Sequence, residues 1–189
     1  MIKIGILGDI GSGKSFVANS FGYPVFNADN EVAKIYKKNK ICFIKIKKLL
    51  PKYIKTFPID KAELTNAILS NKSNIKKITK IVHPLVRKKM NLFLLKNKKR
   101  RLVILDIPLL LENKLKNKDT ILVFVEAKKS DISKRLNKRK SFNSKIFKRL
   151  KEIQLPLDYK KKKSKYVIKN YHTKKFVRKS VKNLLKKIL

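Results

Sequence analysis

The stretch "GDIGSGKS" (Gly8–Ser15) decides the fold of this chain, which has only five glycines among its 189 residues. Gly8, Gly13, Lys14 and Ser15 fit the pattern G-x-x-x-x-G-K-[ST], in which a glycine-rich turn wraps the phosphates of a nucleotide. Such a turn brings backbone N–H groups close to the ligand and needs positive φ angles, which glycine adopts without a steric penalty. The stretch therefore predicts a phosphate-binding loop.

The residues on both sides of the loop supply the strand and the helix that the motif requires. "IKIGIL" (Ile2–Leu7) predicts a buried strand, and "KSFVANSFG" (Lys14–Gly22) has helical spacing that ends at a glycine. The start of that helix directs partial positive charge at the phosphates, where Lys14 would neutralise the β- and γ-oxygens and the Ser15 hydroxyl would bind Mg²⁺. We expect a nucleoside triphosphate site formed by Gly8, Asp9, Ile10, Gly11, Ser12, Gly13, Lys14, Ser15 and Phe16.

Four more apolar runs predict further strands, and the chain closes with an amphipathic helix. Strands that are apolar throughout and separated by helices are typical of a parallel sheet covered on both faces. We therefore expect an α/β fold: a three-layer core with about five parallel strands. The four strands are expected at Tyr23–Asp29, Leu102–Leu105, Thr120–Ala127 and Lys165–Asn170, and the last helix at Lys174–Leu189.

The region from Glu31 to Lys98 has a mostly helical pattern. Asp60 is placed to cap a helix, with Glu63 three residues later as in a variant of the capping box. A helical stripe of apolar residues follows, and we expect Pro84 to interrupt it.

Composition limits the class of protein less than the motif does. The net charge of +39 fits either a polyanionic partner or compositional drift toward lysine, and the even spread of the lysines favours drift. The single cysteine, Cys42, suits a reducing compartment, and the sequence has neither a signal peptide pattern nor a long apolar run. We expect a cytoplasmic protein.

Among proteins with a phosphate-binding loop, a small-molecule kinase fits this sequence best. No string matches the guanine-reading pattern N-K-x-D of GTPases. A kinase needs an acceptor site, a base beside it and a cover that excludes water. The helical region can hold the acceptor, Asp29 follows the second strand at the edge where ligands bind, and the basic segment around Arg135, Arg139 and Arg149 can act as the cover.

Further motifs make the interpretation more specific. They are "NAD" (Asn27–Asp29), the His83-Pro84 pair, "DIPLLLE" (Asp106–Glu112), the R-L-x-x-R of Arg135–Arg139, Gln154 and "YVIKN" (Tyr166–Asn170). Together with "GILGDIGSGKS", they resemble the dephospho-CoA kinase family over essentially the whole chain. The sequence departs from the usual family pattern at Asp9, Phe16, Asn27, Thr65 and Asp131.

The resemblance implies an activity and a layout. The activity is phosphorylation of the ribose 3′-hydroxyl of dephospho-CoA by ATP with Mg²⁺. The layout is a nucleotide-binding core (1–35, 99–134 and 164–189), a helical CoA-binding insertion (about 36–98) and a lid (about 135–163). The partners would be the two small-molecule substrates, with no specific nucleic acid and no membrane, and a monomer is compatible with the sequence. Acceptor-binding residues would be Asp29, His83, Pro108 and Leu109.

The candidate catalytic residues each have a structural alternative. Asp29 is the expected general base, alternatively a cap of the next helix. Asp106 could help to hold Mg²⁺ through water or could cap a turn. Arg139 or Arg135 could stabilise charge on the transferred phosphoryl group, with Arg139 the better candidate, or both could be surface residues. For His83 a packed structural role is favoured over contact with the acceptor.

Two other functions stay open at this point. The nearer one is another small P-loop kinase that acts on a nucleoside, nucleotide or shikimate-like acceptor. The more distant one is a nucleic-acid-binding ATPase, which would concentrate its basic residues in a patch and bind polyanions with a steep salt dependence.

Overall fold

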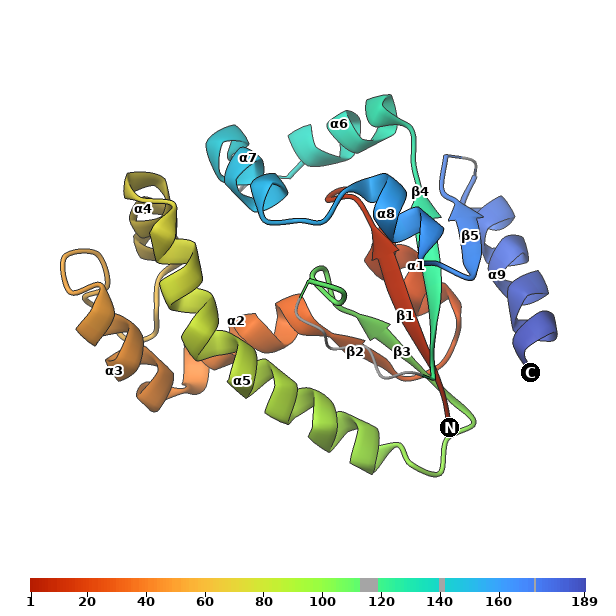
Figure 1. The fold of residues 1–189 in the computed structure, drawn as a ribbon, viewed down its shortest axis with the longest axis horizontal. Helices are drawn as coiled ribbons and strands as arrows, with labels where there is room; N and C mark the ends of the chain where they lie inside the picture. The colour runs from red at the N-terminus through yellow and green to blue at the C-terminus, as the bar shows by residue number, and fades with distance from the viewer. Residues whose placement is uncertain (113–118, 140–141, 172) are drawn as a thin grey trace. The chain divides into compact units, whose positions relative to one another are not determined.

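The structure is a computed structural model that describes residues 1–112, 119–139, 142–171 and 173–189. Within these residues, five parallel strands form one sheet in the order β2-β3-β1-β4-β5 (Figure 1). The strands are β1 (Ile2–Gly8), β2 (Val25–Asn27), β3 (Leu102–Asp106), β4 (Thr120–Glu126) and β5 (Tyr166–Lys169). The predicted fold class is confirmed, because the sheet is parallel and helices flank it.

The chain divides into two compact units. The first comprises Met1–Asn27, Phe93–Phe142 and Gln154–Leu189, and the second comprises Ala28–Leu92 and Asn143–Ile153. The expected division into core, insertion and lid stays a prediction, and the lid range includes positions 140–141, which lie outside the described residues.

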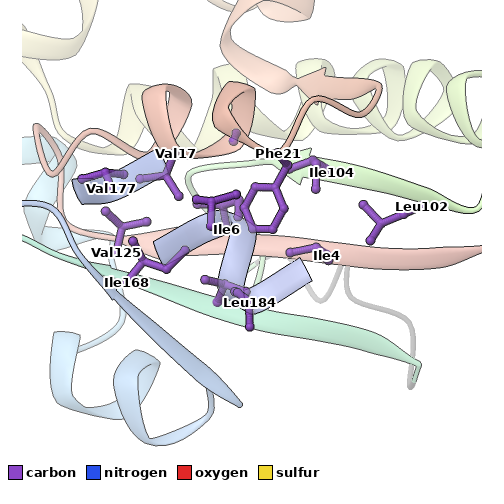
Figure 2. Close-up of a cluster of buried hydrophobic side chains, with 13 residues drawn as sticks. Ile4, Ile6, Val17, Phe21, Leu102, Ile104, Val125, Ile168, Val177 and Leu184 are labelled. Carbon is purple, nitrogen blue, oxygen red and sulfur yellow. The ribbon is translucent and has the colours of Figure 1, made fainter. Parts of the chain in front are cut away.

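In the first unit, α1 (Lys14–Ser20) and α9 (Lys174–Ile188) bury their apolar faces against the sheet. Figure 2 shows Ile4 and Ile6 of β1 among side chains from both helices, including Val17 of α1 and Leu184 of α9. Successive strand residues point to opposite faces, so Ile4 and Ile6 share one face. Each such fully buried side chain contributes about 1.5–3 kcal/mol to stability. This cluster holds β1 in place and thereby fixes the start of the loop that follows β1.

The register of the sheet brings the ends of the strands to one edge. Asn27, the last residue of β2, is the register partner of Asp106, the last residue of β3. Gly8 ends β1 beside Val125 of β4. Because parallel strands present their carboxyl ends at the same edge, the loop after β1 and the side chains that end β2 and β3 lie together there.

The remaining helices of the first unit follow β4. They are α6 (Lys129–Asn137) and α8 (Leu157–Lys162), and α8 packs against β1. A side chain at Gly5 of β1 would lie on the face opposite α1 and α9. Because glycine has none, Leu110, from the turn after β3, can approach the strand there. Apolar residues thus cover both faces of the sheet.

The second unit is helical. It holds α2 (Ala28–Lys38), α3 (Lys40–Leu49), α4 (Lys61–Ser70), α7 (Ser144–Glu152) and most of α5 (Ser73–Lys96), which continues into the first unit. Helix α2 contacts α3, and α4 contacts α7. The buried stripe of α5 consists of Ile75, Ile78, Val82, Val86 and Met90. The helical pattern predicted for this region is confirmed.

Three local predictions were wrong or incomplete. The second strand ends at Asn27, so Asp29 lies in the first turn of α2. Pro84 lies inside one continuous helix, because buried residues on both sides of it outweigh the loss of one backbone hydrogen bond. Asp60 does cap α4 through the Ala62 N–H at 2.8 Å. Glu63 does not complete a capping box; its Oε1 accepts from the Lys55 and Thr56 N–H groups at 3.1 and 3.3 Å.

No helix in the described ranges combines the length and the apolar character that crossing a membrane requires.

Candidate nucleotide-binding and phosphoryl-transfer site

The loop between β1 and α1 has the backbone conformation of a phosphate cradle. Gly11 and Gly13 have φ angles of 84° and 89°, in the left-handed region that only glycine enters readily. Helix α1 begins at Lys14, directly after Gly13, so the N–H groups of its first turn face the loop. The geometry predicted from the sequence pattern is present.

Lys14 reaches back across the loop. Its Nζ donates to the carbonyl oxygens of Gly8 at 3.2 Å and Asp9 at 2.8 Å. These contacts hold the ammonium group within the curve of the loop, where phosphate oxygens would meet it. The Asp9 carboxylate, unusual at this position, accepts a hydrogen bond from the Ile10 N–H at 2.7 Å and is largely buried. Asp9 therefore helps to shape the loop.

Three polar side chains from different elements meet beside the loop. Ser15 Oγ donates to Asp106 Oδ2 at 2.6 Å, and Asn27 Nδ2 donates to the same oxygen at 2.7 Å. Asp106 is 2 % exposed, so this carboxylate is held almost out of water by two hydrogen bonds. A hydroxyl and a carboxylate are hard oxygen ligands, and Mg²⁺ beside nucleotide phosphates commonly uses one or two protein groups of this kind. The donor set fits Mg²⁺.

The two arginines of R-L-x-x-R lie in different environments. Arg135, on α6, donates from Nη1 to the Ser12 carbonyl oxygen at 3.1 Å and from Nη2 to the Asn170 carbonyl oxygen at 2.8 Å. Arg139 lies beyond the end of α6, and its side chain is exposed. Arg135 thus contacts the loop backbone, and of the two only Arg139 is left exposed at the start of the expected lid.

Asn170, whose role the sequence did not reveal, also contacts the loop. It follows β5, is 5 % exposed, and donates from Nδ2 to the Ser12 carbonyl oxygen at 2.7 Å. A Cβ atom on Gly13 would collide with this amide. The sequence hinted at it through its place at the end of a predicted strand, at the edge where ligands bind, and as the last residue of the "YVIKN" motif.

A buried ion pair joins the turn after β3 to α8. Lys160 Nζ lies 2.6 Å from Glu112 Oε1, and the two side chains are 0 % and 10 % exposed. The same Glu112 oxygen accepts from the Leu155 N–H at 3.0 Å, and Lys160 also donates to Gln154 Oε1 at 3.2 Å. Sequence reasoning missed Lys160, because it lies in a run of four lysines that reads as a solvated surface. Pro108 and Leu109, half-buried, lie in the same turn after β3.

The second unit holds the other candidate residues. Asp29 is exposed in the first turn of α2, which begins at Ala28, so it is not the capping residue of that helix. His83 is half-buried on α5 and lines a hollow of about 450 Å³ together with Arg87 and Lys88. Burial, and to a smaller degree the charge of Arg87, lowers the pKa of His83 below its ordinary value of 6.5. His83 is therefore neutral at pH 7.

Three features define a P-loop kinase: a parallel sheet of this strand order, a glycine-rich loop after its first strand, and a Ser15–Asp106 pair that joins the start of α1 to the end of β3. A sequence profile of dephospho-CoA kinases matches residues 2–175. The chain therefore belongs to the dephospho-CoA kinase family, and the expected ATP-dependent kinase activity is confirmed at the level of the family.

Individual proteins agree with this assignment. The dephospho-CoA kinase of Wolbachia pipientis wMel is 35% identical over 187 residues, which cover 96% of this chain and 95% of that protein. A crystal structure of the protein TT1252 from Thermus thermophilus has a TM-score of 0.78 at 28% identity, covering 100% of this chain and 98% of that one. Dephospho-CoA kinase from Campylobacter jejuni shares the fold, with a TM-score of 0.62 at 22% identity, covering 100% and 98% of the two chains.

Proposed function

We propose that this chain transfers the γ-phosphoryl group of ATP directly to the ribose 3′-hydroxyl of dephospho-CoA, giving coenzyme A and ADP. The 3′-oxygen forms a bond to the γ-phosphorus while the bond to the β–γ bridging oxygen breaks. The proton of the hydroxyl passes to Asp29, and no covalent enzyme intermediate forms. Positioning and charge stabilisation account for most of the rate enhancement.

The phosphate loop carries this proposal. The left-handed Gly11 and Gly13 and the start of α1 offer N–H donors to the phosphates. The Lys14 ammonium, held at the Gly8 and Asp9 carbonyl groups, lies within reach of the same ligand. A ligand with two or more linked phosphates satisfies all of these donors at once, as ATP does.

Ser15 and Asp106 are the residues that would hold Mg²⁺. The ion, when bound, neutralises charge on the phosphates. Asn27 supports this pair through its amide nitrogen, which donates to Asp106 Oδ2 at 2.7 Å and to Ser15 Oγ at 3.5 Å. The chain's own contribution is to fix the carboxylate: two donors at 2.6 and 2.7 Å leave Asp106 Oδ2 in one position.

The second unit supplies the acceptor side of the reaction. Asp29 is an exposed carboxylate that can accept the proton of an alcohol. The hollow beside His83 has cationic neighbours in Arg87 and Lys88, which suit the diphosphate of dephospho-CoA. Neutral His83 offers one hydrogen-bond donor and one acceptor there. Arg139 would meet the transferred phosphoryl group when the lid closes over both substrates.

Mass spectrometry of the reaction products tests the proposal. Incubation with Mg·ATP and dephospho-CoA should add one phosphoryl group to the acceptor and release ADP. A dephospho-CoA analogue that lacks the 3′-hydroxyl is the matched control and should stay unmodified. If the analogue were phosphorylated, or if Lys14→Ala kept full activity, the proposed site would be wrong.

A further inference from the structure

One carbonyl group in the phosphate loop is held from two sides. The Ser12 carbonyl oxygen accepts a hydrogen bond from Asn170 Nδ2 at 2.7 Å and another from Arg135 Nη1 at 3.1 Å. The donors come from residues 158 and 123 positions away in the sequence, so two distant elements converge on one peptide group. Both lone pairs of this oxygen are engaged, which fixes the plane of the peptide as well as its direction.

The consequence for the ligand follows from peptide geometry. A peptide unit is planar and trans, so the Ser12 C=O and the Gly13 N–H point in opposite directions. Holding the carbonyl group toward Asn170 and Arg135 therefore directs the Gly13 N–H away from them. The left-handed conformation of Gly13 maintains this arrangement, and any side chain there would displace the Asn170 amide.

Arg135 links the surrounding elements to each other as well as to the loop. Its guanidinium also donates to the Asn170 carbonyl oxygen at 2.8 Å and, at 3.5 Å, to that of Gly11. The planar fork of arginine can serve several acceptors at fixed angles, which a lysine ammonium on a flexible stem cannot reproduce. Ile132 and Leu136 of α6 pack against Gly11, so Arg135 is held on a helix that already touches the loop.

We propose that Asn170 and Arg135 are positioning residues that act through the Ser12–Gly13 peptide. They turn the Gly13 N–H toward the phosphates of ATP and keep it there before the nucleotide arrives. This inference rests on the proposed nucleotide site. It gives Arg135 a role different from that of Arg139: Arg135 acts through the loop backbone and does not contact the transferred phosphoryl group.

Two variants test the inference. Asn170→Asp is nearly isosteric but puts an oxygen in place of the donor that faces the Ser12 carbonyl oxygen. Arg135→Lys keeps the charge but loses the fork. Arg178→Lys, on the exposed face of α9, is the matched control. The dissociation constants of ATP and of inorganic tripolyphosphate are measured by competition at constant ionic strength. The KM of dephospho-CoA and the unfolding temperature of the ligand-free protein are measured separately.

We expect each variant to raise the dissociation constants of ATP and tripolyphosphate by a similar factor, about tenfold or more. This is the effect of losing one hydrogen bond to a charged group, here the bond from the Gly13 N–H to a phosphate. The KM of dephospho-CoA at saturating ATP should not change in either variant. Arg178→Lys should bind ATP and tripolyphosphate as the wild type does. Weaker binding of ATP with unchanged binding of tripolyphosphate would overturn the inference, because the residues would then act on the base or ribose.

Three further outcomes distinguish a structural role, failure of the underlying site and failure of the positioning role. A parallel loss of ATP affinity, acceptor affinity and thermal stability would mean a purely structural role and would also overturn the inference. If the wild-type protein itself failed to bind ATP, the proposed function would be wrong. If the wild type bound ATP and both variants bound it equally well, only the positioning role would be wrong.

Discussion

The hydrogen bond between Asn27 and Asp106 leads to a quantitative prediction, because the usual family pattern has a carboxylate in place of Asn27. In Asn27→Asp, an oxygen replaces the amide nitrogen that donates to Asp106 Oδ2 at 2.7 Å. Loss of a hydrogen bond to a charged group costs about 1.5–3 kcal/mol. Two carboxylate charges about 4 Å apart add about 4 kcal/mol at an effective dielectric constant near 20, less where water screens them.

We therefore expect the free energy of unfolding of Asn27→Asp to fall by about 3 kcal/mol in EDTA, since Asn27 is half-buried and part of the repulsion is screened. A second carboxylate would strengthen the binding of Mg²⁺, and Mg²⁺ at about 100 times its dissociation constant should restore about 2.7 kcal/mol. Urea unfolding with EDTA and with Mg²⁺ measures both numbers.

Asn27→Ala is the control for that experiment, because it removes the hydrogen bond without adding a charge. It should lose stability in EDTA but gain no more from Mg²⁺ than the wild type does. If Asn27→Asp were as stable as the wild type in EDTA and insensitive to Mg²⁺, the reasoning about this cluster would be refuted.

Three further predictions concern single residues. Asp29→Asn should lower kcat by about 10²–10⁴-fold with little change in the dissociation constant of ATP, and near-normal turnover would remove Asp29 from the mechanism. Lys160→Met should lower the free energy of unfolding, measured by urea titration, by about 3–5 kcal/mol, because it leaves the Glu112 carboxylate buried without a cation. Adding Glu112→Gln should recover most of this loss. If it recovered none, the loss would not come from the buried ion pair. Because the pKa of His83 is lowered on folding, the unfolded chain binds more protons, so stability is full above about pH 6.5 and falls as the pH drops below it. His83→Gln should lose less stability than the wild type between pH 7 and pH 5, and parallel curves would show that His83 does not contribute.

The sequence predicted the sheet and the phosphate loop well, because both depend on local patterns. Each apolar run is a strand by its own composition, and the loop motif combines four residues within eight positions with a strand before it and a helix after it. The Ser15–Asp106 contact could be anticipated only in outline, since it requires the strand order that places β3 beside β1. The strand order is a tertiary property.

The contacts behind the loop could not be predicted in this way. Arg135 and Arg139 are four residues apart, which on one helix would put both on the same face. Helix α6 ends at Asn137, however, so only Arg135 is held on the helix that touches the loop. Asn170 and Lys160 depend on the packing of α6, α8 and β5 around β1, and no local pattern encodes that arrangement. The Lys160 position is hidden further by the abundance of exposed lysines around it.

The span between the phosphate loop and Asn170 bears on how the protein is made. The loop leaves the ribosome well before Asn170 does, because the amide that fixes its Ser12 carbonyl group belongs to a residue 158 positions later. Contacts of such long range form late in folding. Nucleotide affinity should therefore arise only after Asn170 has been synthesised, and chains that stop before it should not sequester ATP.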